Sequence, residues 1–503
     1  GNFLTLSEVN EASYDSGHSD QFEADDYDFP YLESWYQLNR SNSISWTVEF
    51  WELHYRLAAM SRTIAVLNSI HSQVIDRDFQ NELERLKTDL ALTEPGDCLQ
   101  EIRERAIVWA DALSMTWFED DQKSNERILF NPSNHTISDS EFELAGLAFG
   151  NSDSSRRSYR KSEPSVLLET TDGELPVLRN EFFEVRVDPA TGGVRSVNRH
   201  AKKGNLFSQQ VACRFSHPVM QHGMRRQKSH YANIVVDQID SLDSSSVVGS
   251  IHANGKLLDQ NNQVIARFKQ TTTVERHSPV IKFRVSFELE DPLKGSPWRN
   301  YLGSRIAWAD EDALLVRSEN EIGIPVYQEK FTAPSFIEIR NETCKITLLP
   351  GGLPFHRRSS RRMLDSLMVV EREKRLENTF GIAIDVPSSM GAAVSYQMPM
   401  TTVGVDPLGS ELGGWIFHLS SKNILVTDVS GLVNDGKSIR GIRMRLQETE
   451  GRSGKLRISC PFEINSAART NLLGEKVFDM ELDGDSASCE FLGFQFFQIE
   501  MTW

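Results

Sequence analysis

The stretch Leu178-Arg-Asn-Glu-Phe-Phe-Glu-Val-Arg-Val-Asp-Pro-Ala-Thr-Gly-Gly-Val-Arg-Ser-Val197 decides the fold. Phe183, Val185 and Val187 alternate with charged residues. This period of two places apolar side chains on one face of an extended strand. The residues Asp188-Pro-Ala-Thr-Gly-Gly193 then interrupt the alternation with types that favour turns. The stretch therefore predicts two strands joined by a turn.

The same alternation continues from Leu178 to the end of the chain. Short runs with a period of two are separated by Gly, Asn-Gly, Asp-Gly and Pro. Examples are Val280–Phe287, Phe336–Ile339, Ile442–Leu446 and Phe494–Ile499. A region of this length that holds strands and no interleaved helices predicts large antiparallel β-sandwiches.

Residues 43–118 have a different period. Ser43 or Ser45 can cap a helix, and Asp97 can cap another after the break at Pro95-Gly96. Apolar residues recur at spacings of three and four in three runs, which include Val48 to Ile70, Phe79 to Leu90 and Leu99 to Leu113. Three amphipathic helices with short connections predict an antiparallel bundle. The fold class is therefore α+β by segregation: a three-helix bundle followed by β-sandwiches.

Composition and charge exclude several classes of protein. Of the 503 residues, 39% are hydrophobic and 25% are charged, which is typical of a globular chain. The net charge of −17 argues against a nucleic-acid partner. No apolar run approaches the roughly 20 residues that span a membrane. The five scattered cysteines predict neither a disulfide framework nor a zinc knuckle. The sequence leaves a homo-oligomer possible and gives no compartment.

The first candidate site lies in Gly351-Gly-Leu-Pro-Phe-His-Arg-Arg-Ser-Ser-Arg-Arg-Met-Leu-Asp365. A bend with two glycines and a proline is followed by five nitrogen donors: His356, Arg357, Arg358, Arg361 and Arg362. Guanidinium groups suit carboxylates or vicinal hydroxyls, and a rigid turn would hold them in place. The alternative is a set of surface arginines that pair with the surplus acids.

The second candidate site lies between Trp298 and Asp312 and contains Tyr301, Arg305 and Trp308. Aromatic rings stack on the apolar faces of sugars, while charged groups bond to the hydroxyls. The alternative is a strand with alternating packing and a charged turn. Both candidates are hypotheses for substrate binding, with carbohydrate as the partner.

The sequence assigns no catalytic residue. It has no nucleophile elbow, phosphate-binding loop, dinucleotide fingerprint or zinc-protease motif. Glu119-Asp-Asp121 and Asp310-Glu-Asp312 are adjacent acids that point apart on a strand, so neither supplies a facing pair of carboxylates. No cluster of ligands has the spacing of a metal site.

The order of these segments resembles glycoside hydrolase family 38, the α-mannosidases. In that family a helical bundle leads into a strand ending in a turn like Phe130-Asn-Pro132, and a strand pair like Leu178–Val197 opens a large galactose-mutarotase-like sandwich. Further stretches look like the same family, namely Ala24–Glu33, Ser335–Gly352, Met444–Ile458 and Thr470–Glu475. The resemblance covers most of residues 20–503.

The resemblance implies a retaining glycosidase, in which zinc holds sugar hydroxyls, an Asp is the nucleophile and a second carboxylate is acid and base. In that family the nucleophile and most zinc ligands lie in an N-terminal α/β barrel, which this chain lacks almost entirely. The His-His-Asp motif of the bundle region is also missing, since His71 is followed by Ser-Gln-Val. Zinc is thus expected for an intact family enzyme, with no ligands visible here.

The resemblance also sets the expected domains. Residues 1–42 are irregular and would be the tail of a missing barrel, 43–120 the bundle, 121–430 the large sandwich, and 431–503 C-terminal sandwich strands. The chain begins Gly-Asn-Phe-Leu without Met, so we expect a piece of something longer. The segment after Thr347-Leu-Leu349 matches a family loop near the substrate by position only.

The prediction is an α-mannosidase-like glycoside hydrolase fragment that is inactive alone. One alternative is a non-catalytic carbohydrate-binding or scaffold protein. The other is a sugar lyase or epimerase on the same sandwich, using His356 and the neighbouring arginines.

Overall fold

The computed structural model of the chain describes the greater part of its 503 residues. These are residues 32, 43–70, 77–93, 98–115, 128–138, 143–151, 165–168, 177–200, 204–221, 224–403, 414–434 and 437–503. The predicted tail at 1–42, apart from Leu32, and the predicted break at Pro95-Gly96 lie outside them.

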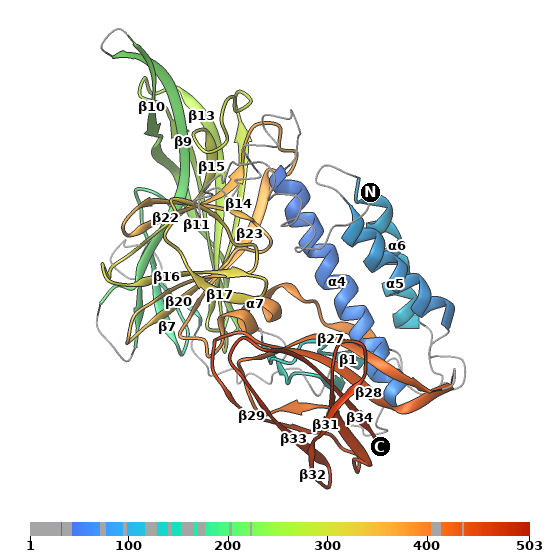
Figure 1. Cartoon of the computed structure of the whole chain (residues 1–503). Coiled ribbons are helices and arrows are strands. Elements are labelled where there is room, and N and C mark those ends of the chain that lie inside the picture. Colours follow the sequence, from blue (N-terminus) through green and yellow to red (C-terminus); the bar gives the residue numbers. More distant parts are fainter. Residues whose placement is uncertain are drawn as a thin grey trace, which may run out of the picture.

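Three helices lie side by side, as the sequence predicted (Figure 1). They are α4 (Ser43–Ile70), α5 (Arg77–Leu92) and α6 (Gln100–Met115). Leu86 of α5 and Ala106 of α6 are completely buried, and they belong to one apolar cluster with Val66 of α4. That cluster extends into the C-terminal strands, so the bundle is anchored to a sheet as well as to itself.

The first turn of α4 is capped by a remote carboxylate. Glu373 Oε1 accepts a hydrogen bond from the backbone N–H of Ile44 at 2.8 Å, and Glu373 Oε2 accepts one from that of Ser45 at 2.9 Å. The hydroxyl of Ser45 donates to the same Oε2 at 2.5 Å. The acceptor for these amides is therefore Glu373, whereas the sequence predicted Ser43 or Ser45. A carboxylate at a helix N-terminus satisfies open N–H groups and complements the helix dipole.

Replacing Glu373 by alanine should lower the free energy of unfolding by about 1–2 kcal/mol, because two helix N–H groups lose their acceptor. Urea unfolding measures this. The control is Glu377→Ala, which removes an acid from a solvent-exposed ion pair with Arg284 and should cost less than about 0.5 kcal/mol. Equal losses in the two variants would contradict the capping role.

Two large antiparallel sheets form the main sandwich. One contains ten strands in the order β18 (Lys330–Thr332), β21 (Phe355–Ser360), β22 (Met363–Val369), β15 (Tyr301–Trp308), β9 (Phe207–Gln221), β8 (Val194–Arg199), β7 (Phe183–Val187), β6 (Val177–Arg179) and β5 (Leu167–Leu168), with β10 (Met224–Tyr231) paired to β9. The other contains nine strands in the order β11 (Asn233–Ser244), β12 (Val248–Leu258), β13 (Val264–Glu275), β14 (Val280–Leu289), β23 (Glu377–Ile384), β20 (Lys345–Leu349), β19 (Ile337–Arg340), β16 (Leu314–Glu319) and β17 (Ile322–Pro325).

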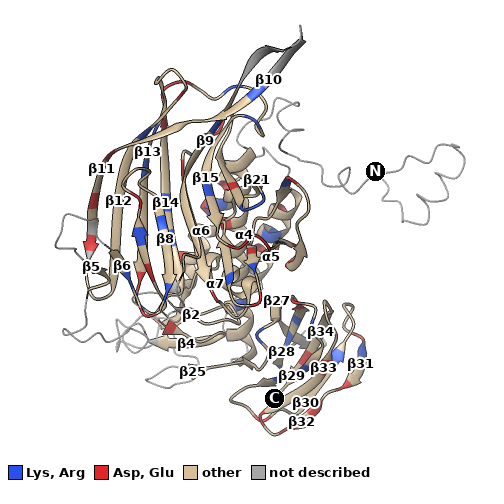
Figure 2. Cartoon of the chain, turned by 90° about the vertical axis from the view of Figure 1, so that its left-hand side faces the viewer, with Lys and Arg blue, Asp and Glu red and all other residues tan. Residues whose placement is uncertain are grey.

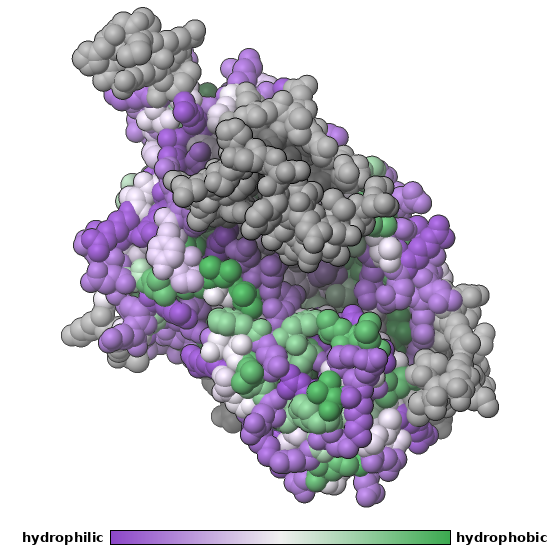
Figure 3. All heavy atoms as spheres, in the orientation of Figure 1, coloured by the Kyte–Doolittle hydropathy of each residue, from purple (hydrophilic) through white to green (hydrophobic). Residues whose placement is uncertain are grey.

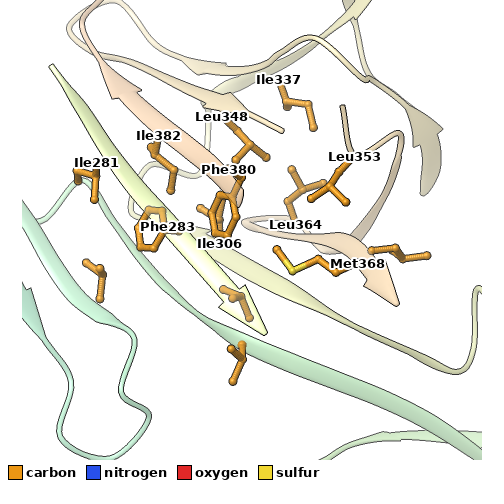
Figure 4. Packing of buried hydrophobic residues seen from close by; sticks show 14 of the residues in the cluster. Ile281, Phe283, Ile306, Ile337, Leu348, Leu353, Leu364, Met368, Phe380 and Ile382 are labelled. Atoms are coloured by element: carbon orange, nitrogen blue, oxygen red, sulfur yellow. The ribbon is translucent and has the colours of Figure 1, made fainter. Parts of the chain in front are cut away.

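The core of this sandwich is built from the alternating apolar residues of its strands. Phe283 of β14 and Phe380 of β23 stack with ring centroids 4.7 Å apart, and both are buried (Figure 4). Ile306 of β15 and Leu364 of β22 belong to the same cluster, so both sheets contribute to it. The sandwich predicted from the sequence is therefore confirmed.

The stretch that decides the fold becomes β7 and β8, paired antiparallel across the turn at Gly192 and Gly193. Gly192 has a φ of +68°, in the left-handed region that favours glycine. At Gly193 a Cβ atom would lie 2.1 Å from the carbonyl oxygen of Gln209 on the neighbouring β9. Both glycines are thus required, one for the turn and one for the close approach of the next strand.

The turn after β1 (Ile128–Phe130) depends on Asn131. Its side-chain amide is completely buried and donates to the carbonyl oxygens of His135 and Leu144 at 2.8 and 2.9 Å. The predicted strand and turn are both present. β1 lies in a four-stranded sheet ordered β24 (Thr401–Val403), β1, β4 (Ala148–Asn151) and β25 (Gly414–Trp415), and a separate pair joins β2 (Ile137–Ser138) to β3 (Glu143–Leu144).

Two further sheets form the C-terminal sandwich. The first has four strands in the order β26 (His418–Leu419), β29 (Gly454–Ser459), β33 (Ser486–Phe491) and β32 (Glu481–Asp483). The second has five strands in the order β27 (Ile424–Asn434), β28 (Lys437–Glu448), β34 (Phe496–Thr502), β30 (Ser466–Thr470) and β31 (Lys476–Asp479). These sheets begin at His418 and Ile424, upstream of residue 431, because β27 pairs with β28 along its length. The division into domains otherwise stays a prediction.

Within its described residues the β region contains a helix, where the sequence predicted none. α7 (Ser389–Gln397) begins after Ser388, whose side chain accepts from the N–H of Gly391. Most of its residues are small or apolar, and Met390, Ala393 and Val394 pack with Tyr55 of α4 and Leu349 of β20. Helix α7 therefore fills the space between the bundle and the large sandwich.

Candidate functional site

Three side chains surround the carboxylate of Asp365, and together with it they form what we call the Asp365 cluster: Tyr231, Tyr301, Arg305 and Asp365. Arg305 of β15 lies directly across from Asp365 of β22. Its guanidinium donates two parallel hydrogen bonds, from Nε to Oδ1 at 2.7 Å and from Nη2 to Oδ2 at 2.9 Å. The hydroxyls of Tyr301 and Tyr231 donate to the same Oδ2 at 2.5 and 2.9 Å.

Burial strengthens the hydrogen bonds of this cluster and determines the protonation states of its groups. Asp365 is 0% exposed, and its charge is balanced by Arg305 and two hydroxyls. Burial and the neighbouring Asp365 carboxylate raise the pKa of Tyr301, so its hydroxyl stays a donor. The Arg305 guanidinium lies 3.8 Å from the ring centroid of Tyr231, which is 37% exposed. The cluster therefore holds Arg305 and Tyr231 in fixed positions, and its fully engaged carboxylate is not a free acid or base.

Arg357 extends the same face onto β21, where its Cα pairs with that of Asp365. Its Nε donates to Glu329 Oε1 at 2.7 Å, its Nη2 pairs with the same oxygen, and its Nη1 donates to the carbonyl oxygen of Trp298 at 3.3 Å. Three of the predicted residues thus lie near one another: Tyr301 and Arg305 on β15, and Arg357 on β21, with β22 between these two strands. Figure 2 shows basic positions on the strands around β15 and β21.

The other predicted residues lie elsewhere. His356 and Trp308 are buried inside the sandwich. The ring of His356 is engaged on both sides, with Ser366 Oγ 3.0 Å from Nδ1 and the carbonyl oxygens of Ala333 and Leu353 3.1 Å from Nε2. Such an imidazole is a structural hydrogen-bonding group and does not reach a surface ligand. Neighbouring residues of a strand point to opposite faces, so His356 lies opposite to Arg357.

Arg358 and Arg361 belong to the hairpin between β21 and β22. Arg358 Nη2 donates to the carbonyl oxygen of Arg361 at 3.1 Å. Arg361 is exposed and pairs with Asp312 at 3.2 Å. This agrees with the alternative interpretation, in which the arginines of this stretch form surface ion pairs with acids. These two residues do not join the Asp365 cluster through any contact in the described part of the chain.

Burial of His356 should make the protein sensitive to acid. Burial lowers the pKa of His356 to about 4, below its ordinary value of 6.5. Between pH 4 and 6.5 the His356 imidazole binds a proton more readily in the unfolded chain than in the folded protein. The contribution to stability is therefore complete above pH 6.5 and is lost as the pH falls toward 4, by up to about 3 kcal/mol.

Urea unfolding of wild type and His356→Gln at several pH values between 4 and 7 measures this effect. The slope of stability with pH should be smaller in His356→Gln, although His54 and His135, whose pKa values burial also lowers to about 4, keep part of it. The control His277→Gln removes an exposed imidazole beside Glu181. A slope in His356→Gln equal to that of wild type would contradict the prediction.

The sequence interpretation missed Tyr231 and the role of Asp365. Arg305 and Asp365 are 60 residues apart and meet only because β15 pairs with β22. Tyr231 ends β10, which folds back on β9. No local signal indicates the pairing of β15 with β22, and the sequence interpretation did not predict the hairpin of β9 and β10. Alternation along Phe355-His-Arg357 was a usable signal, because it places His356 and Arg357 on opposite faces of the sheet.

Other surfaces contain hollows that none of the predicted site residues line. A hollow of about 770 Å³ lies between the two sandwiches, lined by residues that include Glu338, Lys345 and Glu450. Another of about 900 Å³ lies on the C-terminal sandwich, with exposed Leu472, Val477 and Phe478 at its edge. Figure 3 shows apolar side chains gathered over these C-terminal strands.

The described ranges contain neither a cluster of metal ligands nor a membrane-spanning helix. Among those residues, no three His, Cys, Asp or Glu side chains lie close enough to hold a metal ion. The residues described therefore do not fit the zinc ion that the family resemblance implies. None of the described helices is both long and apolar enough to cross a membrane.

The fold is similar to that of two solved structures from Enterococcus faecalis. One is a protein in glycosyl hydrolase family 38, with a TM-score of 0.67 and 10% sequence identity, and the match covers 92% of this chain and 70% of that chain. The other is an alpha-mannosidase from strain V583, with the same TM-score and identity, and coverage of 92% and 68%. No protein-family model and no curated protein matches the sequence.

These matches show a fold like that of glycoside hydrolase family 38 along nearly the whole chain. At 10% identity the likeness establishes the fold alone. About 30% of each solved chain has no counterpart among these 503 residues. The resemblance first noted in the order of segments is confirmed at the level of the fold.

Proposed function

We propose that this chain is the bundle and sandwich portion of an α-mannosidase-like glycoside hydrolase, and that the Asp365 cluster contacts the sugar. The observation that carries the proposal is the fold, which matches a family 38 protein and an alpha-mannosidase over 92% of the chain. The cluster adds an exposed aromatic ring, Tyr231, with the fixed guanidinium of Arg305 over one of its faces, which are groups that a sugar site uses.

The hydrolytic groups are proposed to lie outside the described residues. The family resemblance assigns the nucleophile and the zinc ligands mainly to a barrel, and the described residues hold no group fit to bind zinc. In the proposed enzyme the zinc ion would hold sugar hydroxyls. The role of this chain would be to bind and orient the sugar. We therefore expect sugar binding, and no turnover, from these 503 residues alone.

Two measurements test this proposal. Calorimetry with methyl α-mannoside should detect binding, and an aryl α-mannoside should not be hydrolysed by the isolated chain. Absence of binding would contradict the proposal that the Asp365 cluster contacts a sugar. Hydrolysis at the rate of known glycosidases with stoichiometric zinc would contradict the assignment of the chemistry to a separate barrel.

A non-catalytic carbohydrate-binding protein is the second candidate, because the Asp365 carboxylate is fully engaged and supplies no acid or base. The reading frame upstream of Gly1 separates the two. A barrel encoded there favours the glycosidase, and a start codon at this position favours the binding protein.

A further inference from the structure

Two guanidinium groups converge on one backbone oxygen beside the Asp365 cluster. Arg214 Nη1 donates to the carbonyl oxygen of Trp298 at 2.9 Å, and Arg357 Nη1 donates to the same oxygen at 3.3 Å. A third cation, Lys330 Nζ, lies 5.7 Å from the ring centroid of Trp298. The two guanidinium groups that share this oxygen repel each other unless anions compensate them.

Carboxylates compensate only part of this charge. Arg357 pairs with Glu329, and Arg305 pairs with Asp365. Within the described part of the chain, neither Arg214 nor Lys330 has an acidic partner. Arg214 is half-buried, and burial together with the Arg357 guanidinium lowers its pKa. The Glu329 carboxylate acts on the pKa of Arg214 in the opposite direction, but its ion pair is with Arg357. Among the described residues Arg214 thus has no ion pair of its own in partly desolvated surroundings, in a chain whose overall charge is −17.

Arg214 also retains the donors that an oxyanion would need. A guanidinium has five N–H groups in a planar fork. Those of Arg357 Nε and Nη2 are engaged with Glu329. Arg214 uses Nη1 for the Trp298 carbonyl, and its Nε and Nη2 make no hydrogen bond to the described residues. Forked donation to two oxygens is the geometry with which arginine binds carboxylate, sulfate and phosphate.

The position of Arg214 connects this charge to the sugar site. On β9 its Cα pairs with that of Tyr301 on β15 and with that of Tyr231 on β10. The two tyrosines are members of the Asp365 cluster, and Tyr231 is its exposed ring. One ligand could therefore place a sugar ring against Tyr231 and an acidic substituent at Arg214.

We propose that Arg214, supported electrostatically by Arg357 and Lys330, binds the acidic substituent of a charged sugar, either a carboxylate or a phosphate or sulfate ester. The inference rests on the proposed function for the sugar and adds the chemical class of the ligand. Arg214 acts by direct donation to the anion. Arg357 and Lys330 act through the positive potential, because the fork of Arg357 is occupied.

Calorimetry with the full chain tests the inference, using mannose, mannose 6-phosphate, mannuronate and inorganic phosphate as separate probes. At least one acidic sugar should bind about tenfold or more tightly than mannose, since hydrogen bonds to a charged group are the stronger kind. Arg214→Gln should abolish that difference, and Arg214→Lys should keep part of it. The matched control Arg186→Gln removes one charge from β7 of the same sheet and should change nothing.

The outcomes separate this inference from the proposed function. Equal binding of mannose and both acidic sugars would overturn the inference and leave the sugar site standing, and so would a preference that survives in Arg214→Gln. Binding of phosphate that depends on Arg214, with no binding of any sugar, would support the anion site and overturn the sugar proposal. Absence of binding by every probe would overturn both. Thermal unfolding of Arg214→Gln verifies that the variant is folded.

Discussion

Replacing Asp365 by alanine should lower the free energy of unfolding by about 3–5 kcal/mol, because the change leaves the Arg305 guanidinium without its buried partner. Arg305 would keep its charge in a site from which most water is excluded, and two tyrosine hydroxyls would lose their acceptor. Urea unfolding followed by circular dichroism measures the loss.

Two further variants show whether the loss comes from burial of the pair. Asp483→Ala removes an acid from the exposed ion pair with Arg457 and should cost less than about 1 kcal/mol. The double variant Arg305→Met with Asp365→Leu removes both charges and should recover most of the stability. A loss below about 1 kcal/mol in Asp365→Ala would mean that water reaches the cluster.

Phe380→Ala should also lower the free energy of unfolding by about 3–5 kcal/mol, because it opens a cavity in the middle of the large sandwich. The Phe380 ring is buried and stacked on Phe283 at 4.7 Å (Figure 4). Thermal and urea unfolding measure the effect.

Phe496→Ala is the matched control for that variant, because the ring of Phe496 is 44% exposed on the C-terminal sandwich. Its loss should stay within about 1 kcal/mol. If the two phenylalanine variants lost the same amount, the centre of the apolar core would lie elsewhere than between β14 and β23.

The fold was largely predictable because its elements have strong periods. The helices α4, α5 and α6 and the strands β7, β14 and β28 lie where apolar residues recur at helical or strand spacing. Helix α7 was missed, since its small residues Ser389-Met-Gly-Ala-Ala393 carry neither period clearly. Its helical state depends on packing against α4 and β20.

The site was only partly predictable, for a physical reason. Residue types pointed to Tyr301, Arg305 and Arg357, which the structure brings to one face. The pairing of β15 with β22 and of β9 with β10 decides which groups complete the cluster. β15 and β22 are distant in sequence, and the hairpin of β9 and β10 was not predicted, so Tyr231, Arg214 and the role of Asp365 required the structure.

The most direct test of the proposed sugar site is the affinity of methyl α-mannoside for the full chain and for two tyrosine variants. Tyr231→Leu removes the exposed ring of the Asp365 cluster, and Tyr327→Leu removes a ring that is 82% exposed outside it. We expect binding to wild type, a loss of about three- to tenfold in Tyr231→Leu, and no change in Tyr327→Leu. Equal affinity of the two variants, or no binding to wild type, would contradict the account.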